Sequence, residues 1–253
     1  MTDTANIKAM RLTVSQQLKE WFTQYLGQYV LDQERAELEK IVPNLFGYHL
    51  MQIGLLHDQG LFPSTRIGHC FVVQIDNDEI MQANIELKCS ADSLPISSNS
   101  VDVVVLPHVL EFSENPHKIL REIERVLIGR GRLIIIGFNP WSLFGLWRIF
   151  LGWRDEPPWC GHFFSFHRIR DWFTLLGFEL IRHERICYRP PIKSIKIMKR
   201  LAFMEKLGKY CWSIFSGIYI VEIEKTVVPV TPVKDIWLKR RNMIKSSIVE
   251  PTT

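Results

Sequence analysis

Residues 91–138 read "ADSLPISSNSVDVVVLPHVLEFSENPHKILREIERVLIGRGRLIIIGF" and hold two apolar runs separated by one amphipathic segment. The first run, 101–110, is rich in valine, as is typical of a buried strand. The segment 115–132 predicts a helix, because its apolar residues recur at helical spacing. The run LIIIGF, 133–138, is almost continuously apolar, as expected of a strand buried on both faces. A strand, a helix and a strand in this order predict a parallel sheet.

The same alternation continues on both sides of this stretch. Three short strands are predicted before it, in the segments 48–54, 69–76 and 85–92. After it, the segment 165–186 predicts a helix followed by a strand, and 217–225 predicts a last strand. An amphipathic helical segment, 15–41, comes first, with Ser15 as its expected N-cap. In the central helix, Gly129 and Gly131 are expected to form the terminating turn.

These elements predict a three-layer α/β sandwich built on a mostly parallel seven-stranded sheet. Ligands of such sheets bind beyond the carboxyl ends of the strands, where the strand order reverses. The first strand ends there, at Gly54. The predicted organisation is a helical extension over 1–43, the sheet domain over 44–225 and a basic tail over 226–253.

Composition gives a prediction about cellular location. The chain has 253 residues, of which 47% are hydrophobic and 23% charged, as in ordinary globular proteins. Its five cysteines are scattered and form no CxxC pair, which favours a reducing compartment. The first residues have no apolar signal core, and no run of about 18 apolar residues follows. We expect a cytoplasmic protein. No metal site is expected, since Cys160, His162 and His167 lack the paired spacing that zinc favours.

Charge is divided unevenly along the chain. Residues 1–184 carry 17 Lys and Arg against 22 Asp and Glu, whereas residues 185–253 carry 14 against 5. Basic tails can attract nucleic acid or anionic lipid, but a solvated tail is the commoner case. No motif for reading nucleic acid accompanies the charge, so nucleic-acid binding is not predicted.

The segment 139–153, NPWSLFGLWRIFLGW, is unusually aromatic. Three interpretations stay open. It could cover an apolar substrate, rest on a membrane surface as an interfacial helix, or be buried in a core or dimer interface. A peripheral membrane contact is therefore one of the expected alternatives.

The central stretch resembles the class I S-adenosylmethionine-dependent methyltransferases of the small type 11 group. The matching parts are "AD.LP", "SVDVVV", "REIERVL" and "GRLIIIG", and "FSFHRIRDWFTLLGFEL" at 164–180 matches the later helix and strand of that family. The resemblance extends over about residues 46–225. It implies S-adenosylmethionine as cofactor and methyl transfer to a small-molecule or apolar acceptor.

The resemblance departs from the family pattern after the first strand. Gln52 stands at the acidic position, Gly54 is the first glycine, and Leu56 and Asp58 occupy the places of the later glycines. Gln52 and Gly54 are still expected to border the cofactor. Because of this departure, the alternative function is a non-catalytic binding or scaffold protein that keeps the fold and has lost the cofactor.

The resemblance also assigns roles around the cofactor. Asp76 is expected to bind the ribose hydroxyls, with Asp78 as the alternative, although either could simply form a turn.

Asp92 and Ser93 are expected near the adenine, unless Asp92 only caps a turn. Leu106 and His108 follow at the place where the family holds the transferred methyl group. His108 is the candidate general base, a buried structural histidine being the alternative, and Glu111 could assist it or merely be exposed.

Overall fold

The computed structural model describes residues 17–54, 65–75, 85–151, 157–192 and 194–227. They form a seven-stranded sheet in the order β3-β2-β1-β4-β5-β7-β6. The strands are β1 (His49–Ile53), β2 (His69–Ile75), β3 (Ile85–Cys89), β4 (Val101–Pro107), β5 (Leu127–Phe138), β6 (Phe178–Ile186) and β7 (Ile218–Lys225). Strands β1 to β5 are parallel, and β7 is antiparallel to both of its neighbours. The predicted mostly parallel, seven-stranded sheet is confirmed.

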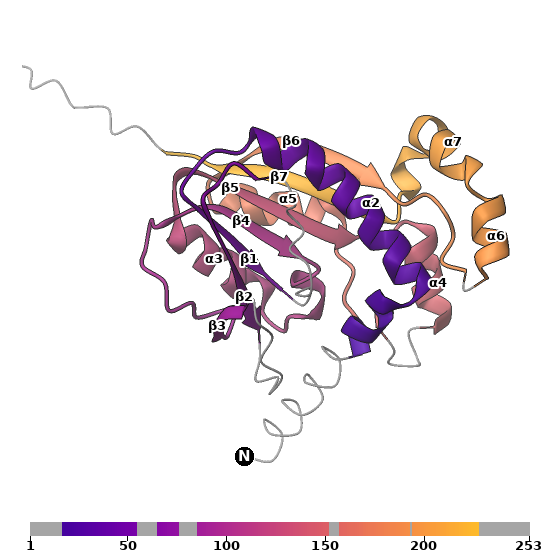
Figure 1. Ribbon diagram of the computed structural model, residues 1–253, viewed down its shortest axis with the longest axis horizontal. Coiled ribbons are helices and arrows are strands. Elements are labelled where there is room, and N and C mark those ends of the chain that lie inside the picture. Colours follow the sequence, from indigo (N-terminus) through magenta and orange to yellow (C-terminus); the bar gives the residue numbers. More distant parts are fainter. Residues whose placement is uncertain (1–16, 55–64, 76–84, 152–156, 193, 228–253) are drawn as a thin grey trace, which may run out of the picture.

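Helices cover both faces of this sheet (Figure 1). The helices are α2 (Tyr25–Ile41), α3 (Pro116–Val126), α4 (Leu143–Leu151), α5 (Phe166–Leu175), α6 (Ile195–Arg200) and α7 (Phe203–Cys211), with 3-10 turns η1 (Val42–Asn44), η2 (Leu110–Phe112) and η4 (Ser213–Phe215). Residues 17–23 form a further helical segment before α2.

Two apolar cores result, one on each side of the sheet. On one face, Val30 and Leu38 of α2 and Phe144 of α4 pack against alternate strand residues such as Val105 and Ile136. On the other face, α3 and α5 pack against the intervening residues, including Val104 and Ile135. This alternation follows from the two-residue side-chain period of a strand, and it confirms the three-layer sandwich.

The strand order reverses between β1 and β4. The chain adds β2 and β3 on one side of β1, then crosses to form β4 on the other side. Leu50, Met51 and Gln52 of β1 lie opposite Val103, Val104 and Val105 of β4. The carboxyl ends of β1 and β4 therefore meet at the predicted switch point, beside Gly54.

The central helix ends earlier than the sequence predicts. Helix α3 stops at Val126, and Leu127 already pairs with Val101 of β4. The next pair in the ladder is Val103 with Arg132, so the residues of β5 between Leu127 and Arg132 bulge out of it. Gly129 and Gly131 lie in this bulge within β5 and not in a helix-ending turn. The pairing of Leu127 with β4 overrides the local signal of the two glycines.

Asp102 fixes the beginning of β1. Its Oδ2 accepts hydrogen bonds from the backbone N–H groups of Tyr48 and His49, both at 2.9 Å. The preceding residue, Gly47, has φ +152°, and a Cβ there would lie 2.3 Å from the Cβ of Asp102. The aspartate of the SVDVVV segment thus sets where β1 starts against β4.

We expect Asp102→Ala to lower the free energy of unfolding by about 2 kcal/mol, because two backbone donors lose a charged acceptor. Chemical denaturation measures this change. Asp171→Ala, an exposed aspartate on α5, is the matched control and should change stability by less than about 0.5 kcal/mol. Equal effects of the two substitutions would contradict the anchoring role.

Candidate active site

Gly54 ends β1 in a conformation that favours glycine. Its φ is +147°, and a Cβ there would lie 3.1 Å from both the Pro107 carbonyl oxygen and Val109 Cγ2. Its N–H donates to the carbonyl of Val73 at 3.3 Å. The backbone at the end of β1 therefore lies in close contact with the end of β4. Glycine is required at this position both by the positive φ and by the short distance to Pro107 and Val109.

Two buried glutamines stand beside this point. Gln52 in β1 and Gln74 in β2 are almost fully inaccessible to solvent. Neither amide atom of the Gln74 side chain has a hydrogen-bond partner among the described residues. A buried amide in this position is a donor and acceptor available to a polar ligand, because unsatisfied buried polar groups are costly. Sequence reasoning predicted Gln52 and missed Gln74, although Gln74 breaks the apolar run FVVQI.

Asp92 and Ser93 lie in a tight turn after β3. Ser93 N–H donates to the carbonyl of Ser90 at 3.1 Å, and the Ser90 hydroxyl donates to the Asp92 carboxylate. Both Asp92 and Ser93 are exposed to solvent. Their side chains are therefore free to meet a ligand at this edge of the sheet, which is where the resemblance places the adenine.

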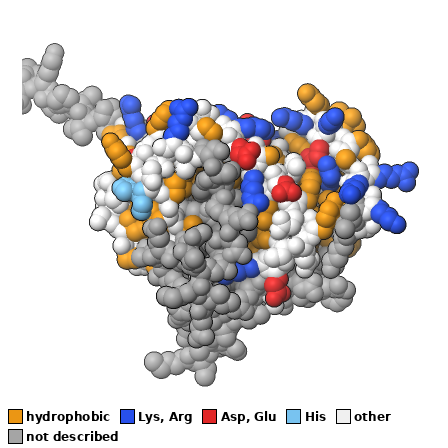
Figure 2. Space-filling view, viewed as in Figure 1, with side chains coloured by type: hydrophobic (Ala, Val, Ile, Leu, Met, Phe, Trp, Pro, Cys, Tyr) orange, Lys and Arg blue, Asp and Glu red, His pale blue; other side chains and the backbone are white. Residues whose placement is uncertain are grey.

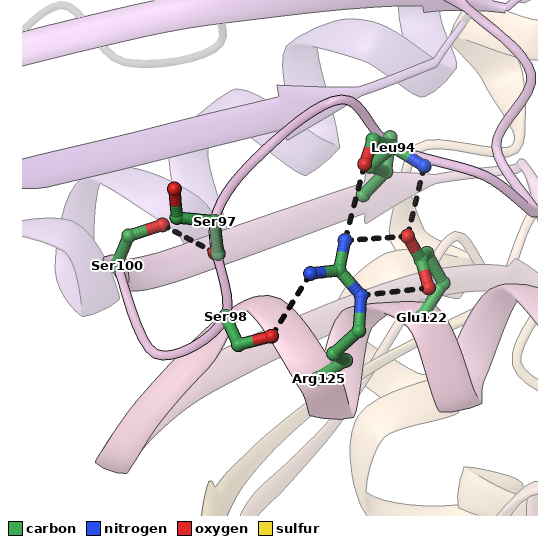
Figure 3. Close-up of polar contacts among 6 residues, drawn as sticks. All are labelled: Leu94, Ser97, Ser98, Ser100, Glu122 and Arg125. Carbon is green, nitrogen blue, oxygen red and sulfur yellow. Dashed lines mark hydrogen bonds and ion pairs between the residues drawn. The ribbon is translucent and has the colours of Figure 1, made fainter.

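A pair of residues on α3 holds the loop that follows this turn. Figure 3 shows Glu122 and Arg125 projecting from α3 toward residues 94–100. Glu122 Oε1 accepts from Leu94 N–H at 2.9 Å, and Arg125 Nη2 donates to the Leu94 carbonyl at 3.1 Å.

Arg125 Nη2 also donates to Glu122 at 2.6 Å, which lowers the pKa of the Glu122 carboxyl, and Arg125 Nη1 reaches the Ser98 hydroxyl at 3.0 Å. The (i, i+3) spacing of REIER is the signal that could have identified this pair.

Leu106 and His108 lie on either side of Pro107 at the end of β4. Leu106 is fully buried in the core on the α3 side of the sheet. His108 has φ +52°, an uncommon conformation for a non-glycine residue, and its N–H donates to the Ile136 carbonyl at 3.0 Å. Such backbone strain is typical of functional sites.

The imidazole of His108 is enclosed by two carboxylates. Its Nε2 lies 2.7 Å from Glu34 Oε1 of α2, and its Nδ1 lies 3.5 Å from Glu111 Oε1 of η2. The ring stacks on Phe138, with centroids 4.3 Å apart. Burial alone would lower the pKa of His108, but Glu34 and then Glu111 outweigh it and raise the pKa to about 10. The raised pKa favours the charged form of the ring. Its Nε2 makes the short contact to Glu34, whereas its Nδ1 has no hydrogen-bond partner among the described residues.

Glu111 is buried, so the alternative of a merely exposed side chain is wrong. Its Oε1 accepts the backbone N–H of Phe138 at 2.6 Å and so connects η2 to the end of β5. A Cβ at Gly137 would lie 2.4 Å from the Tyr219 hydroxyl oxygen and 3.0 Å from the same Glu111 oxygen. Gly137 therefore makes room first for Tyr219 and then for this carboxylate. The glutamate from α2, Glu34, was not identified from the sequence as part of this cluster.

Several predicted positions fall outside the described residues. These are the N-cap Ser15, the glycine-motif positions Leu56 and Asp58, and the ribose candidates Asp76 and Asp78. Within the described part of the chain, no group of three or more His, Cys, Asp and Glu could hold a metal ion. The site that can be described consists of Gln52, Gly54, Gln74, the Asp92 turn and the His108 cluster.

Comparison with known proteins adds independent evidence. Residues 53–135 match the type 11 family described as "Methyltransferase domain". The uncharacterized protein YafS of Escherichia coli K12 is 31% identical over 183 residues, which are 72% of this chain. The chain spans 66% of the length of YafS.

Solved structures show the same fold. A S-adenosylmethionine-dependent methyltransferase from Thermotoga maritima superposes with a TM-score of 0.63 at 16% identity, covering 86% of this chain and 99% of that one. A methyltransferase of Haloferax volcanii, solved with the Trm112 methyltransferase activator, gives 0.56 at 14% identity, over 85% of this chain and 98% of that one. The chain therefore has the fold of these solved methyltransferases, and its residues 53–135 match the methyltransferase domain family.

Proposed function

We propose that the protein transfers a methyl group from S-adenosylmethionine to a small or apolar acceptor. The observation that carries the proposal is Gly54, whose left-handed backbone lies against the Pro107 carbonyl at the switch point of the sheet. Open α/β sheets bind ligands at this point, and a glycine lets the main chain approach a cofactor closely. The glycine is kept here even though the later glycines of the motif are replaced.

The residues of the described site suit the parts of that cofactor. Backbone at Gly54 would border its amino-acid portion, Asp92 and Ser93 would meet the adenine, and the free amide of Gln74 would offer a polar contact near the ribose. Asp76, two residues beyond Gln74, stays our candidate for the ribose hydroxyls. When bound, S-adenosylmethionine supplies an electrophilic methyl group on a sulfonium. The protein then needs only to position the acceptor and to exclude water.

We infer a positioning role for His108 and not the role of a free base. An imidazole that is already charged at neutral pH cannot accept a proton from an acceptor. Its ion pairs with Glu34 and Glu111 instead hold α2, η2 and the ends of β4 and β5 together. Proton removal by His108 stays a prediction that would require its release from Glu34.

Binding of the cofactor tests the proposal directly. We expect calorimetry to detect binding of S-adenosylmethionine and of its demethylated product to the full chain. Gly54→Ala should weaken this binding by at least about tenfold, because the strained backbone must move. Gly68→Ala is the matched control, since a Cβ at Gly68 meets nothing within 4 Å. Absence of binding at millimolar ligand in the unaltered protein would favour the scaffold alternative.

Arg125 should influence affinity without touching the cofactor. We expect Arg125→Ala to weaken cofactor binding by roughly tenfold, because the loop after the Asp92 turn loses its contact with α3 at a cost of about 1–2 kcal/mol. Lys118→Ala, on the exposed face of the same helix, should leave the affinity unchanged. Isothermal titration measures the cofactor affinity of both variants. Equal affinities of the two variants would contradict a role of Arg125 in cofactor binding.

The charged state of His108 predicts a pH dependence of stability. The pKa of His108 is about 10 in the folded protein and about 6.5 when unfolded, so its stabilisation is complete below pH 6.5 and is lost as the pH rises toward 10. We expect the free energy of unfolding to fall over this range.

In Glu34→Gln, stability at pH 7 should be lower by about 3 kcal/mol and the fall with pH should be smaller. Denaturation at a series of pH values, with the exposed Glu39→Gln as control, measures both effects. An unchanged pH profile in Glu34→Gln would show that the ion pair does not carry the charge.

A further inference from the structure

The elements after β5 expose apolar side chains on a surface that the methyl-transfer site does not use. Trp141, before α4, is 70% exposed, and Ile149 within α4 is 78% exposed, with Phe150 beside it. In α7, Phe203, Leu207 and Tyr210 are exposed and lie at positions i, i+4 and i+7 of one helical face. We call these six residues the apolar surface.

The packing of α4 and α7 does not use these exposed faces, because each of the two helices buries another of its own faces. Phe144 of α4 is fully buried and packs near Phe138 and Trp159. In α7, a Cβ at Gly208 would lie 2.5 Å from the Tyr188 ring, so this side of the helix is pressed against the segment after β6. Within the described part of the aromatic segment, Phe144 belongs to the core, whereas Trp141, Ile149 and Phe150 are exposed.

The two exposed faces belong to neighbouring parts of the structure. Asn139, at the end of β5, donates through Nδ2 to the carbonyls of Ile214 and Ser216 at 2.8 and 2.9 Å, and its Oδ1 accepts from Trp141 N–H at 3.1 Å. One side chain thus joins the segment before α4 to the segment that follows α7. Figure 1 shows α4, α6 and α7 at the same end of the molecule.

Positive charge accompanies the exposed apolar side chains of α7. Residues 194–216 contain five Lys and Arg and one acidic residue, Glu205. The Glu205 carboxylate is turned inward, where it accepts from Tyr188 N–H at 3.2 Å and lies 3.8 Å from Arg189. The five basic residues are exposed: Lys196, Lys199, Arg200, Lys206 and Lys209. Figure 2 shows blue and orange side chains interspersed at the end where Figure 1 places α6 and α7.

We propose that this surface binds the face of a membrane that contains anionic lipid. Aromatic and aliphatic side chains enter the boundary between headgroups and acyl chains, and lysine and arginine beside them are attracted to anionic headgroups. None of the described helices is long and apolar enough to cross a bilayer, so the contact is peripheral.

Charge decides between a membrane and a second copy of this chain. A symmetric dimer would place the same patch on both subunits, and the five cations would then face five cations. An anionic lipid surface complements them. The membrane contact does not rest on the proposed methyl transfer.

Sedimentation with lipid vesicles tests the contact in the full chain. We expect binding to vesicles of phosphatidylcholine with phosphatidylglycerol, weaker binding to phosphatidylcholine alone, and weaker binding at high salt. Lys206→Glu combined with Lys209→Glu should reduce binding by at least about tenfold, since each charge near the surface contributes about fivefold. Phe203→Ser combined with Leu207→Ser should reduce it by a similar factor.

Matched controls separate this surface from the rest of the chain. Leu175→Ser replaces a leucine that is 86% exposed at the end of α5, and Lys118→Glu with Arg121→Glu reverses two exposed charges on α3. Replacing Lys239, Arg240 and Arg241 by alanine tests the basic tail. Full binding by these three variants, with loss in the two surface variants, supports the proposal. Loss confined to the tail variant, or equal binding to neutral and anionic vesicles, overturns it.

Two further measurements test the proposal even if a surface variant fails to fold. In the unaltered protein, brominated acyl chains should quench tryptophan fluorescence. Trp212, directly after α7, is exposed like Trp141, so Trp141→Phe with Trp212→Phe should remove most of that quenching. No quenching in the unaltered protein overturns the proposal. The proposal is also overturned if the protein does not bind vesicles but forms a concentration-dependent dimer, and if Phe203→Ser with Leu207→Ser abolishes that dimer. Cofactor affinity is measured separately. It shows whether the proposed methyl transfer fails independently of the proposed membrane contact.

Discussion

The buried ion pair between Glu34 and His108 connects the parts of the structure that surround the site. A charged imidazole inside a protein is stable only when carboxylates and hydrogen bonds compensate for its desolvation. Glu34 supplies this compensation from α2, and Glu111 supplies it from η2 while also holding the end of β5. The arrangement makes the N-terminal helix part of the same core as the sheet. The boundary predicted at residue 43 separates segments of sequence and not independently packed bodies.

The same cluster fixes the backbone conformation at the end of β4. His108 is held in a left-handed conformation by its bond to Ile136, by its stacking on Phe138 and by its two carboxylates. Pro107, just before it, presents its carbonyl to Gly54. Strain at this corner therefore supports the close approach of β1 and β4 at which a cofactor of this family would lie. The residues that shape the site do so largely by fixing backbone and not by offering reactive groups.

The two proposals concern two regions with different physical demands. The cofactor region needs close backbone approach and a few polar groups, which Gly54, Gln74 and the Asp92 turn provide. The apolar surface needs only exposed aromatic and basic side chains on short helices beyond β5.

The sequence alone determined the layers, the strand count and the switch point at Gly54, because these follow from local periodicity and from the right-handed crossover of parallel strands. It also located the Asp92 turn and His108, each of which follows a predicted strand. Only the tertiary structure decided which distant residues meet them. Glu34 lies 74 residues before His108 and looks like any helical glutamate until α2 packs on the sheet. The early end of α3 was decided in the same way, since the pairing of Leu127 with Val101 outweighs two glycines. Such contacts depend on the free energy of the whole fold and not on local preference, so no short stretch of sequence encodes them.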